Sequence, residues 1–511
     1  MDTSSAQTGN QFALAVIPIL PNVTLLLLLI PGLCLSLLAT VFSLRHQSTR
    51  KAVMLVLWRK KALALAGLAV LLGGIASFRY FYGEEQHHPV ATRPPDSIQD
   101  WPMHRGGPLR HGSLAGEAGP SHGGLQWTFR PGDQFYASAA TDNHFVYTVG
   151  CRNNRGRIFC LESQTGSVVW SAAPSGYAAT FSSPVISGNF LVVGEGLHHT
   201  QSGRVVCVDL CPGREGTILW TYQTNSHIEC TPVISNDLVY VAAGDDGLYC
   251  LQLNSKYADQ RVVWHRAGKD YPDAETSLIV HDGLLYLGLG VGGRALCVLD
   301  ALSGREIKRL KMPFPVFGPP SVHAGKLFVG MGQGDYVTPN QSAAGQICCI
   351  DINTLKVDWT YKTPGTVLGS VTVISGTNDR KTPGTFWIAC GCSNGTLLLL
   401  NSDGEVAAQI DTKAPILGSP ATAGNCLYIA NNAGEIMGLK APSLEIFWQF
   451  RLKSTLRQIS SPIIHGGQLF LGTETTGFVC LGDTAETRVL PGGHTSSSRE
   501  FRQPFTTDKV E

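Results

Sequence analysis

The sequence predicts an all-β fold, an eight-bladed β-propeller, preceded by N-terminal transmembrane helices. Three observations support this prediction: a tryptophan that recurs at a nearly constant spacing, a fixed order of strand and turn signals within each period, and an apolar N-terminus unlike the rest of the chain. The composition agrees, because 57 glycines and 28 prolines in 511 residues suit many short strands joined by tight turns.

The recurring tryptophan ends an apolar strand. From Trp127 to Trp264 the successive gaps are 43, 50 and 44 residues. Later gaps are about two periods long, and we expect Leu310 and Gln409 to stand in the vacant places. The repeated tryptophans are Trp127, Trp170, Trp220, Trp264, Trp359 and Trp448.

Each period contains the same four strand signals. A small residue, often followed by proline, leads a first strand, and a second strand follows such as LVYVAAG at 238–244. A glycine-containing hairpin then leads to a third strand, such as RVVCVD at 204–209, and a fourth strand ends at the tryptophan. Four strands in 40–50 residues is the unit of a propeller blade. Eight such units begin near Ala139, Pro184, Pro232, Leu278, Pro320, Val371, Pro420 and Pro462.

The ends of the repeat predict how the ring closes. The eighth unit has a third strand at 477–482 but no fourth strand, whereas LQWTF at 125–129 precedes the first unit and has no blade of its own. We therefore expect 125–129 to complete the eighth blade, because closure protects strand edges that would otherwise be exposed.

The N-terminus predicts a membrane anchor over residues 1–83. Hydrophobic segments at 12–44 and 62–82 are separated by a connector with six basic residues, Arg45 to Lys61. Basic residues beside a span stay in the cytoplasm, so we expect the propeller in the periplasm or an equivalent extracytoplasmic space, tethered to the inner (cytoplasmic) membrane. Alternatively, only 62–78 spans and 12–44 lies along the membrane.

The remaining boundaries follow from polarity. We expect a linker at 84–100, the propeller at 101–483 and a disordered tail at 484–511. His87 and His88 in the linker are interpreted as solvated residues. The net charge of +1 and the 15% charged residues do not favour a nucleic-acid partner.

Most cysteines occupy one repeat position in the third strand. Recurrence at one packing position indicates buried free thiols and not a disulfide framework. Cys297 joins the set if its strand carries a one-residue offset, and Leu399 and Gly438 fill the place in two units. The set comprises Cys160, Cys207, Cys250, Cys349 and Cys480.

Two further cysteine pairs are interpreted as structural. The vicinal pair Cys348–Cys349 lies within a strand, so its side chains should point to opposite faces. Cys390 and Cys392 should share one face, at a spacing that is neither a zinc knuckle nor a redox motif.

Few residues suggest chemistry. Glu195, His198 and His199 share a hairpin loop and offer possible metal ligands, but we favour exposed loop histidines. Asp245-Asp246-Gly247 is interpreted as a hairpin turn and not as a pair of catalytic carboxylates. The segment GLGVGG at 288–293 leads into a strand and not a helix, which argues against a nucleotide-binding loop. No catalytic, cofactor-binding or metal-binding residue is assigned.

The segment WPMHRGG at 101–107, followed by Arg110-His111-Gly112, resembles the opening motif of pyrroloquinoline-quinone-like (PQQ-like) β-propeller repeat proteins. Blade ends such as LESQTGSVVW at 161–170 look like the same family's repeat, and together the motifs cover about 101–483. The family is similar to two functional groups: quinone-dependent dehydrogenases, and non-catalytic propellers such as the lipoprotein of bacterial outer-membrane protein assembly.

The resemblance implies different sites in the two groups. A quinone dehydrogenase needs a calcium or lanthanide ion held by a carboxylate and an amide, a catalytic aspartate and a tryptophan platform, and a vicinal disulfide lies over its cofactor. This set cannot be placed on the sequence, so we expect no cofactor.

We favour a non-catalytic scaffold that binds other envelope proteins and is anchored in the lipid bilayer. Loops at Val337–Gly345 and Thr377–Thr385 are candidate contact places, although we favour the interpretation that they are simply tolerated insertions. The alternatives are a membrane-bound PQQ-dependent dehydrogenase with PQQ and calcium, and a sensor of small ligands or carbohydrates.

Overall fold

The computed structural model describes residues 101–114, 118–142, 144–254, 260–334, 344–375, 386–453 and 457–483. Within these ranges there is no α-helix, and accordingly none that is long and apolar enough to cross a bilayer. The predicted hydrophobic segments, the linker with His87 and His88, the tail and nearly all of the two candidate loops lie outside the described residues.

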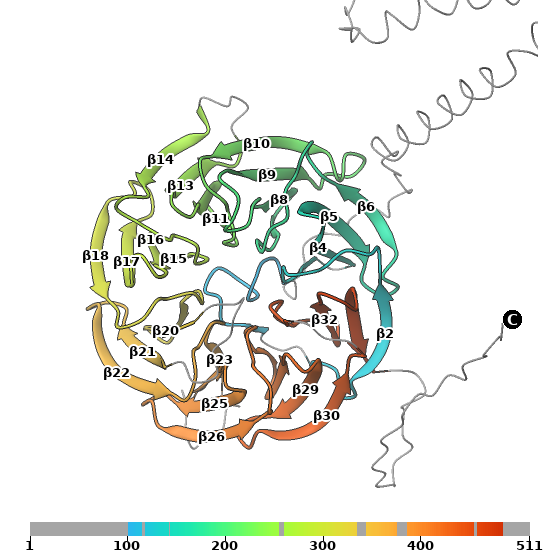
Figure 1. Ribbon diagram of the computed structural model, residues 1–511, viewed down its shortest axis with the longest axis vertical. Helices are drawn as coiled ribbons and strands as arrows, with labels where there is room; N and C mark the ends of the chain where they lie inside the picture. The colour runs from blue at the N-terminus through green and yellow to red at the C-terminus, as the bar shows by residue number, and fades with distance from the viewer. Residues whose placement is uncertain are drawn as a thin grey trace, which may run out of the picture. The chain divides into compact units, whose positions relative to one another are not determined.

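Eight sheets, each with four antiparallel strands, are arranged in a ring, which confirms the predicted eight-bladed β-propeller (Figure 1). In each blade the first strand lies nearest the centre of the ring, and the following strands lie side by side towards the rim, where the last strand is found. Blades 1 to 4 are β3 (Ala140–Asp142), β4 (Phe145–Arg152), β5 (Arg155–Glu162) and β6 (Val168–Ala172); β7 (Val185–Ser187), β8 (Phe190–Val193), β9 (Gly203–Asp209) and β10 (Ile218–Thr224); β11 (Val233–Ser235), β12 (Leu238–Ala242), β13 (Gly247–Gln252) and β14 (Val262–Ala267); and β15 (Ile279–His281), β16 (Leu284–Gly288), β17 (Ala295–Asp300) and β18 (Glu306–Lys311).

The remaining blades follow the same order. Blades 5 to 8 are β19 (Ser321–His323), β20 (Lys326–Gly332), β21 (Gly345–Asp351) and β22 (Lys356–Thr363); β23 (Thr372–Ser375), β24 (Phe386–Gly391), β25 (Thr396–Asn401) and β26 (Val406–Asp411); β27 (Ala421–Ala423), β28 (Cys426–Ala430), β29 (Glu435–Lys440) and β30 (Glu445–Arg451), with the short β1 (Ser113–Leu114) added to β27; and β31 (Ile463–His465), β32 (Gln468–Gly472), β33 (Phe478–Gly482) and β2 (Gly124–Phe129).

The ring closes as the sequence predicts. β2 pairs antiparallel with β33, and Trp127 lies opposite Cys480. The eighth blade is thus built from both ends of the propeller, and its side chains form one core cluster with those of the seventh and first blades. Closure in this way leaves no blade without two neighbours.

Tryptophans at the rim join one blade to the next. Trp264 of blade 3 stacks on Gly304, which lies in the turn before the last strand of blade 4, and donates its indole N–H to the carbonyl oxygen of Ala301 at 2.9 Å. A Cβ at Gly304 would lie 2.6 Å from this indole, and the backbone there has φ +66°. Only glycine meets both conditions. The same indole-to-carbonyl bond recurs at 2.9–3.0 Å for Trp127, Trp220, Trp359 and Trp448.

Blades 4 and 6 have no tryptophan at the rim, and the turn of the following blade that faces the vacant position is also changed. Lys308 pairs with Val298 and Ala408 pairs with Leu399, so these residues, and not Leu310 and Gln409, hold the tryptophan position. The prediction was wrong because a register irregularity follows this pair in every blade, which spacing alone does not locate.

In the facing turns, leucine replaces glycine. Leu355 and Leu444 each donate a backbone N–H to the carbonyl four residues earlier, as Gly304 does, and keep a positive φ of 52° and 57°. Their side chains pack in the core clusters of these blade junctions. At the other junctions a large tryptophan packs on a small glycine in the next turn. Here the turn supplies the larger apolar residue, and the leucine fills the space that an indole fills elsewhere.

The third-strand cysteines are buried at successive blade junctions, and all thirteen described cysteines are free thiols. Leu399 and Gly438 hold the equivalent places, as predicted. The condition for Cys297 is not met: its strand has no offset, Val298 occupies the repeat position, and Cys297 points to the opposite face.

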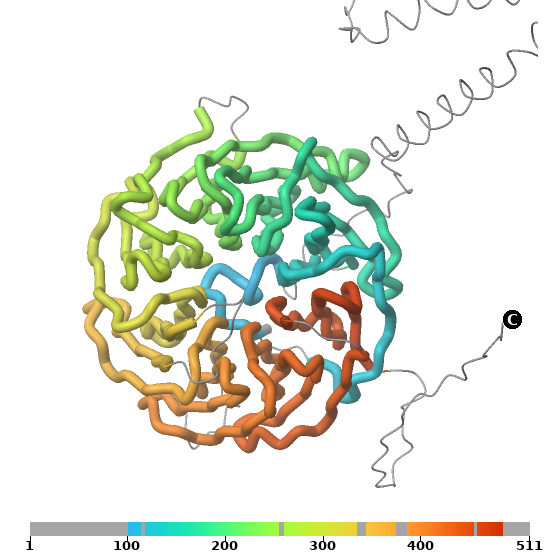
Figure 2. The backbone as a smooth tube through the Cα atoms, in the orientation of Figure 1, coloured from blue at the N-terminus to red at the C-terminus, as the bar shows by residue number. Residues whose placement is uncertain are grey.

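The first described residues, 101–112, cross the centre of the ring (Figure 2). Their hydrogen bonds to the innermost strands place this segment across the central channel. We call this segment the plug. Its carbonyl oxygens accept backbone N–H groups from the innermost strands of five blades, at Thr141, Ile186, Val322, Val373 and Thr422. The plug thereby satisfies donors on strand edges that face the channel.

Two buried arginines add side-chain bonds from the plug to blades 3, 4, 6 and 7. Arg110 donates to the carbonyl oxygens of Leu278 at 2.7 Å, Thr231 at 3.1 Å and Pro232 at 3.2 Å, which belong to blades 3 and 4. Arg105 donates to the carbonyl oxygens of Val371 at 2.9 Å and of Pro420, in blades 6 and 7. Planar guanidinium groups suit this task because they present several donors in fixed directions.

We predict that Lys308→Trp and Leu355→Gly each destabilise the protein but do so less than additively when combined. In Lys308→Trp the new indole clashes with Leu355, and in Leu355→Gly a cavity opens. The double variant restores the tryptophan–glycine packing of the other junctions. A double-mutant cycle on thermal unfolding should give a favourable coupling of about 1–3 kcal/mol. Additive effects would contradict the proposed equivalence of this junction to the others.

We also predict that Arg110→Lys lowers the stability by about 2–4 kcal/mol, because an ammonium group cannot serve carbonyls spread over two blades and buried acceptors lose their donors. Calorimetry of the variant measures this loss. Arg152→Lys, at an exposed position, is the matched control and should leave the unfolding temperature unchanged. Equal unfolding temperatures for Arg110→Lys and the wild-type protein would show that the plug is not held by this side chain.

Candidate functional site

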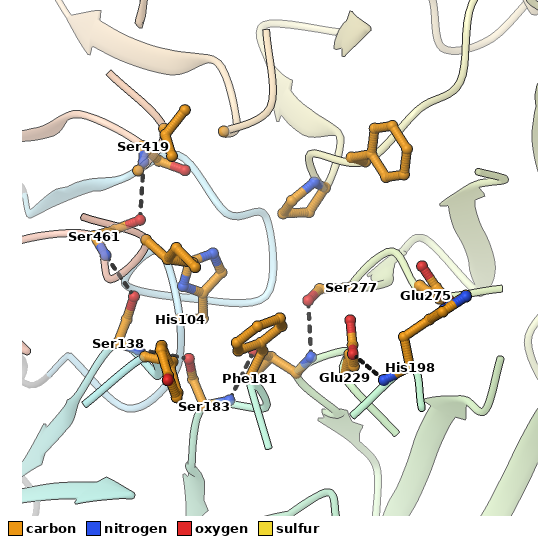
Figure 3. A pocket seen from close by; sticks show the side chains of 18 of the residues that line it. His104, Ser138, Phe181, Ser183, His198, Glu229, Glu275, Ser277, Ser419 and Ser461 are labelled. Carbon is orange, nitrogen blue, oxygen red and sulfur yellow. Dashed lines mark hydrogen bonds and ion pairs between the residues drawn. The ribbon is translucent and has the colours of Figure 1, made fainter. Parts of the chain in front are cut away.

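The channel is open on the side of the plug that carries His104, and there it forms a pocket of about 420 Å³ (Figure 3). Its wall is made by the segments that enter the innermost strands, and His104 of the plug lies at its floor. The pKa of His104 lies well below its ordinary value, and the imidazole is therefore neutral. The main cause is burial, and the positive charges of Arg110 and Arg105 lower the pKa further. Its Nδ1 has no hydrogen-bond partner among the described residues.

A chain of hydroxyl groups forms the inner wall. Ser138 of blade 1 donates its backbone N–H to the hydroxyl of Ser183 at 3.0 Å, and Ser183 donates in the same way to Thr231 at 3.2 Å. Equivalent bonds join blades 3 and 4, 6 and 7, 7 and 8, and 8 and 1. The chain is interrupted at blade 5, where Pro319 offers neither a hydroxyl nor an N–H. The pocket wall is therefore rigid over most of the ring.

One side of the pocket is acidic. Glu229, Asp273 and Glu275 line it, and no lysine or arginine is among the described lining residues. Burial and the charge of Glu275 raise the pKa of Glu229 to about 7. Burial alone would raise the pKa of Glu275, but hydrogen bonds from His227 and His198 outweigh it and hold that pKa below its ordinary value. This side of the pocket favours a cation.

Two histidines meet Glu275 at the acidic wall. His198 Nδ1 lies 2.8 Å and His227 Nε2 lies 2.9 Å from the same oxygen, Glu275 Oε1. His198 comes from the β8–β9 loop, His227 from the connection between blades 2 and 3, and Glu275 from the connection between blades 3 and 4. The hydrogen bond to Glu275 raises the pKa of His198. Two imidazoles and a carboxylate are donors that can hold a divalent metal ion.

The sequence grouped His198 with the wrong partners. Glu195 forms an ion pair with Arg204 and accepts the N–H of Ala178, and His199 is exposed. The true neighbours, His227 and Glu275, lie 29 and 77 residues further along the chain. No sequence motif links them, because the blade order alone brings these loops together.

Apolar side chains also line the pocket. Tyr136 and Phe181 form an edge-to-face pair, whereas Phe317 and Val291, which is 58% exposed, lie on the acidic side next to Asp273. Aromatic side chains are enriched at surfaces that bind another protein.

The pocket does not match the quinone site that the family resemblance implies. It offers carboxylates, including Asp273, but the described lining residues contain no tryptophan to support a ring and no carboxamide to complete the metal ligands.

The vicinal cysteines lie away from the pocket lining. As predicted, they point to opposite faces of β21: Cys348 packs in the core towards blade 4 and Cys349 in the core towards blade 6. Burial raises the pKa of Cys348 to about 11 and that of Cys349 to about 12. Cys390 and Cys392 share one core cluster, also as predicted.

Comparison with known families and structures agrees with this architecture. A family model described as "Outer membrane protein assembly factor BamB" matches residues 178–334 and 385–497, more than half of the chain. No curated protein matches the sequence.

Solved structures share the fold at low identity. BamB from Moraxella catarrhalis is 14% identical with a TM-score of 0.53, over 71% of this chain and 98% of that one. A europium-containing methanol dehydrogenase is 11% identical with a TM-score of 0.55, over 73% and 90%. The computationally designed protein Ika8 is 14% identical with a TM-score of 0.54, over 71% and 100%. At these identities the likeness concerns the fold alone.

We predict that N-ethylmaleimide at pH 8 modifies Cys211 and Cys426 of the native protein long before Cys348 and Cys349. The first two are partly exposed, whereas burial and a pKa raised to about 11 and 12 leave the vicinal pair almost without thiolate. Peptide mass spectrometry after brief labelling measures the order. Early labelling of Cys348, or its crosslinking to Cys349 by a mild oxidant, would contradict the buried, opposed geometry.

Proposed function

This chain belongs to the PQQ-like β-propeller family of the outer membrane protein assembly factor BamB, and we propose that it is a non-catalytic scaffold that binds other proteins of the cell envelope. In this proposal the segments 12–44 and 62–82 anchor it in the cytoplasmic membrane, with the propeller on the extracytoplasmic side. The family description supports envelope proteins as the class of partner.

The observation that carries the proposal is the composition of the pocket at the channel mouth. It combines three carboxylates with aromatic and aliphatic side chains, on a wall fixed by hydrogen bonds between blades. A segment of a partner protein with basic and apolar side chains complements both kinds of group. A rigid surface supports such binding because little conformational entropy is lost on association.

The pocket also supports a protein partner over a redox cofactor. The described lining lacks the tryptophan and the carboxamide of a quinone site, and the plug lies across the channel behind it. We therefore propose that no PQQ is bound.

We predict that a photo-crosslinking amino acid at Val291 gives discrete adducts with envelope proteins in native membranes. Val291 lines the pocket and is exposed, so a partner seated there lies within reach. The matched control is Leu302, which is 71% exposed in the turn between β17 and β18 and does not line the pocket. Immunoblotting and mass spectrometry identify the adducts. The same adducts from both positions, or none from Val291, would contradict a partner site at the mouth.

Titration of the purified full-length protein with PQQ, with and without calcium, separates the scaffold from a dehydrogenase. We expect no heat of binding at micromolar concentrations, because the pocket does not complement the quinone. Binding at about 1 μM or tighter would replace the scaffold proposal by an oxidoreductase.

A further inference from the structure

The histidine–glutamate trio at the acidic wall has the composition of a metal centre, and we propose that His198, His227 and Glu275 bind a divalent transition-metal ion of the zinc class. This proposal goes beyond the scaffold function and does not depend on it. The three donor atoms, one from each residue, all lie within 4.8 Å of one another.

The spacing of the donors suits a tetrahedral ion. Zinc binds imidazole nitrogen and carboxylate oxygen at about 2.0–2.2 Å, which places neighbouring ligand atoms about 3.3 Å apart. The two nitrogens lie 2.8 and 2.9 Å from Glu275 Oε1, so a separation of a few tenths of an ångström makes room for the ion. The two nitrogens lie no more than 4.8 Å apart, and rotation of the side chains on binding would have to supply the rest of the adjustment.

The surroundings orient the ligands. His227 is buried, and its second ring nitrogen, Nδ1, lies 3.2 Å from the hydroxyl of Ser226, which leaves Nε2 directed at Glu275. Glu229 accepts the backbone N–H of His198 at 2.5 Å and so fixes the β8–β9 loop against the wall. Hydrogen bonds of this kind to the ligands are typical of metal sites.

The charge of the wall favours a cation. Glu229, Asp273 and Glu275 face the pocket, and no lysine or arginine lines it among the described residues. Two neutral imidazoles and one carboxylate compensate part of a double positive charge. The donor set of two nitrogens and one oxygen suits zinc, cobalt or nickel better than magnesium or calcium, which prefer oxygen.

The proposed site has an open position. His198 and Glu275 also line the pocket, so a fourth ligand can approach from there (Figure 3). A metal ion would connect loops of blades 2, 3 and 4. It would also offer a coordination place for water or for a donor from a bound partner.

The alternative is a trio joined by hydrogen bonds alone, with both imidazoles donating to Glu275. That arrangement needs no ion and would bind one no better than other surface histidines. A metal site and a hydrogen-bonded trio therefore differ in their affinity for a metal ion. They also differ in whether that affinity depends on His198 and His227 or on other histidines.

The test is calorimetric titration of full-length protein with zinc chloride, after treatment with EDTA and without a polyhistidine tag. We expect one site per chain with a dissociation constant of about 1 μM or lower. His198→Ala should weaken binding at least about tenfold, and because His198 is exposed this variant should fold. His199→Ala, which removes the neighbouring exposed histidine, is the matched control and should bind as the wild type does.

Two further measurements keep the outcome decisive. Cobalt should give visible absorption bands of a low-coordinate site, and Glu275→Gln, which keeps the side chain's size, should abolish them. Replacement of His87 and His88 by alanine should leave the titration unchanged. No zinc binding, binding that survives His198→Ala and Glu275→Gln, or binding that is lost with His87 and His88 would each overturn the proposal.

Discussion

The packing of a rim tryptophan on the turn of the next blade is the interaction on which the ring depends. The indole of Trp264 covers Gly304 and bonds a carbonyl oxygen of the same turn, so each blade fixes the position of its neighbour. Because the same contact also joins Trp127 to blade 1 and Trp448 to blade 8, the ring closes with the geometry that builds it. Where leucine replaces glycine, at Leu355 and Leu444, the tryptophan is replaced as well. At these two junctions the larger apolar side chain comes from the turn and not from the preceding blade.

At the centre of the ring, neighbouring blades are joined by hydrogen bonds, whereas at the rim they are joined by apolar packing. The hydroxyl chain through Ser138 and Ser183 joins neighbouring blades, and the plug joins blades that are far apart. Arg105 and Arg110 bond carbonyl oxygens and not carboxylates, so they satisfy the backbone of the innermost strands instead of pairing charges.

The plug and the hydroxyl chain give the pocket a fixed floor and wall, and loops between blades supply its chemistry. Glu275, His198 and His227 converge at the acidic wall only because blades 2, 3 and 4 are adjacent in the ring. A surface built in this way can vary its loops without disturbing the blades, which is why fold and function separate in propellers.

The sequence by itself determined the features that follow from local periodicity. Blade number, the pairing of 125–129 with the last strand, and the opposed faces of Cys348 and Cys349 all depend on strand alternation and repeat length. Only the tertiary structure decided that Lys308 and not Leu310 holds the tryptophan position, because a register irregularity of one residue shifts which side chain meets the next blade. It likewise decided the plug and the histidine–glutamate trio. Their partners lie tens to hundreds of residues apart, and ring closure, which no local pattern encodes residue by residue, brings them into contact.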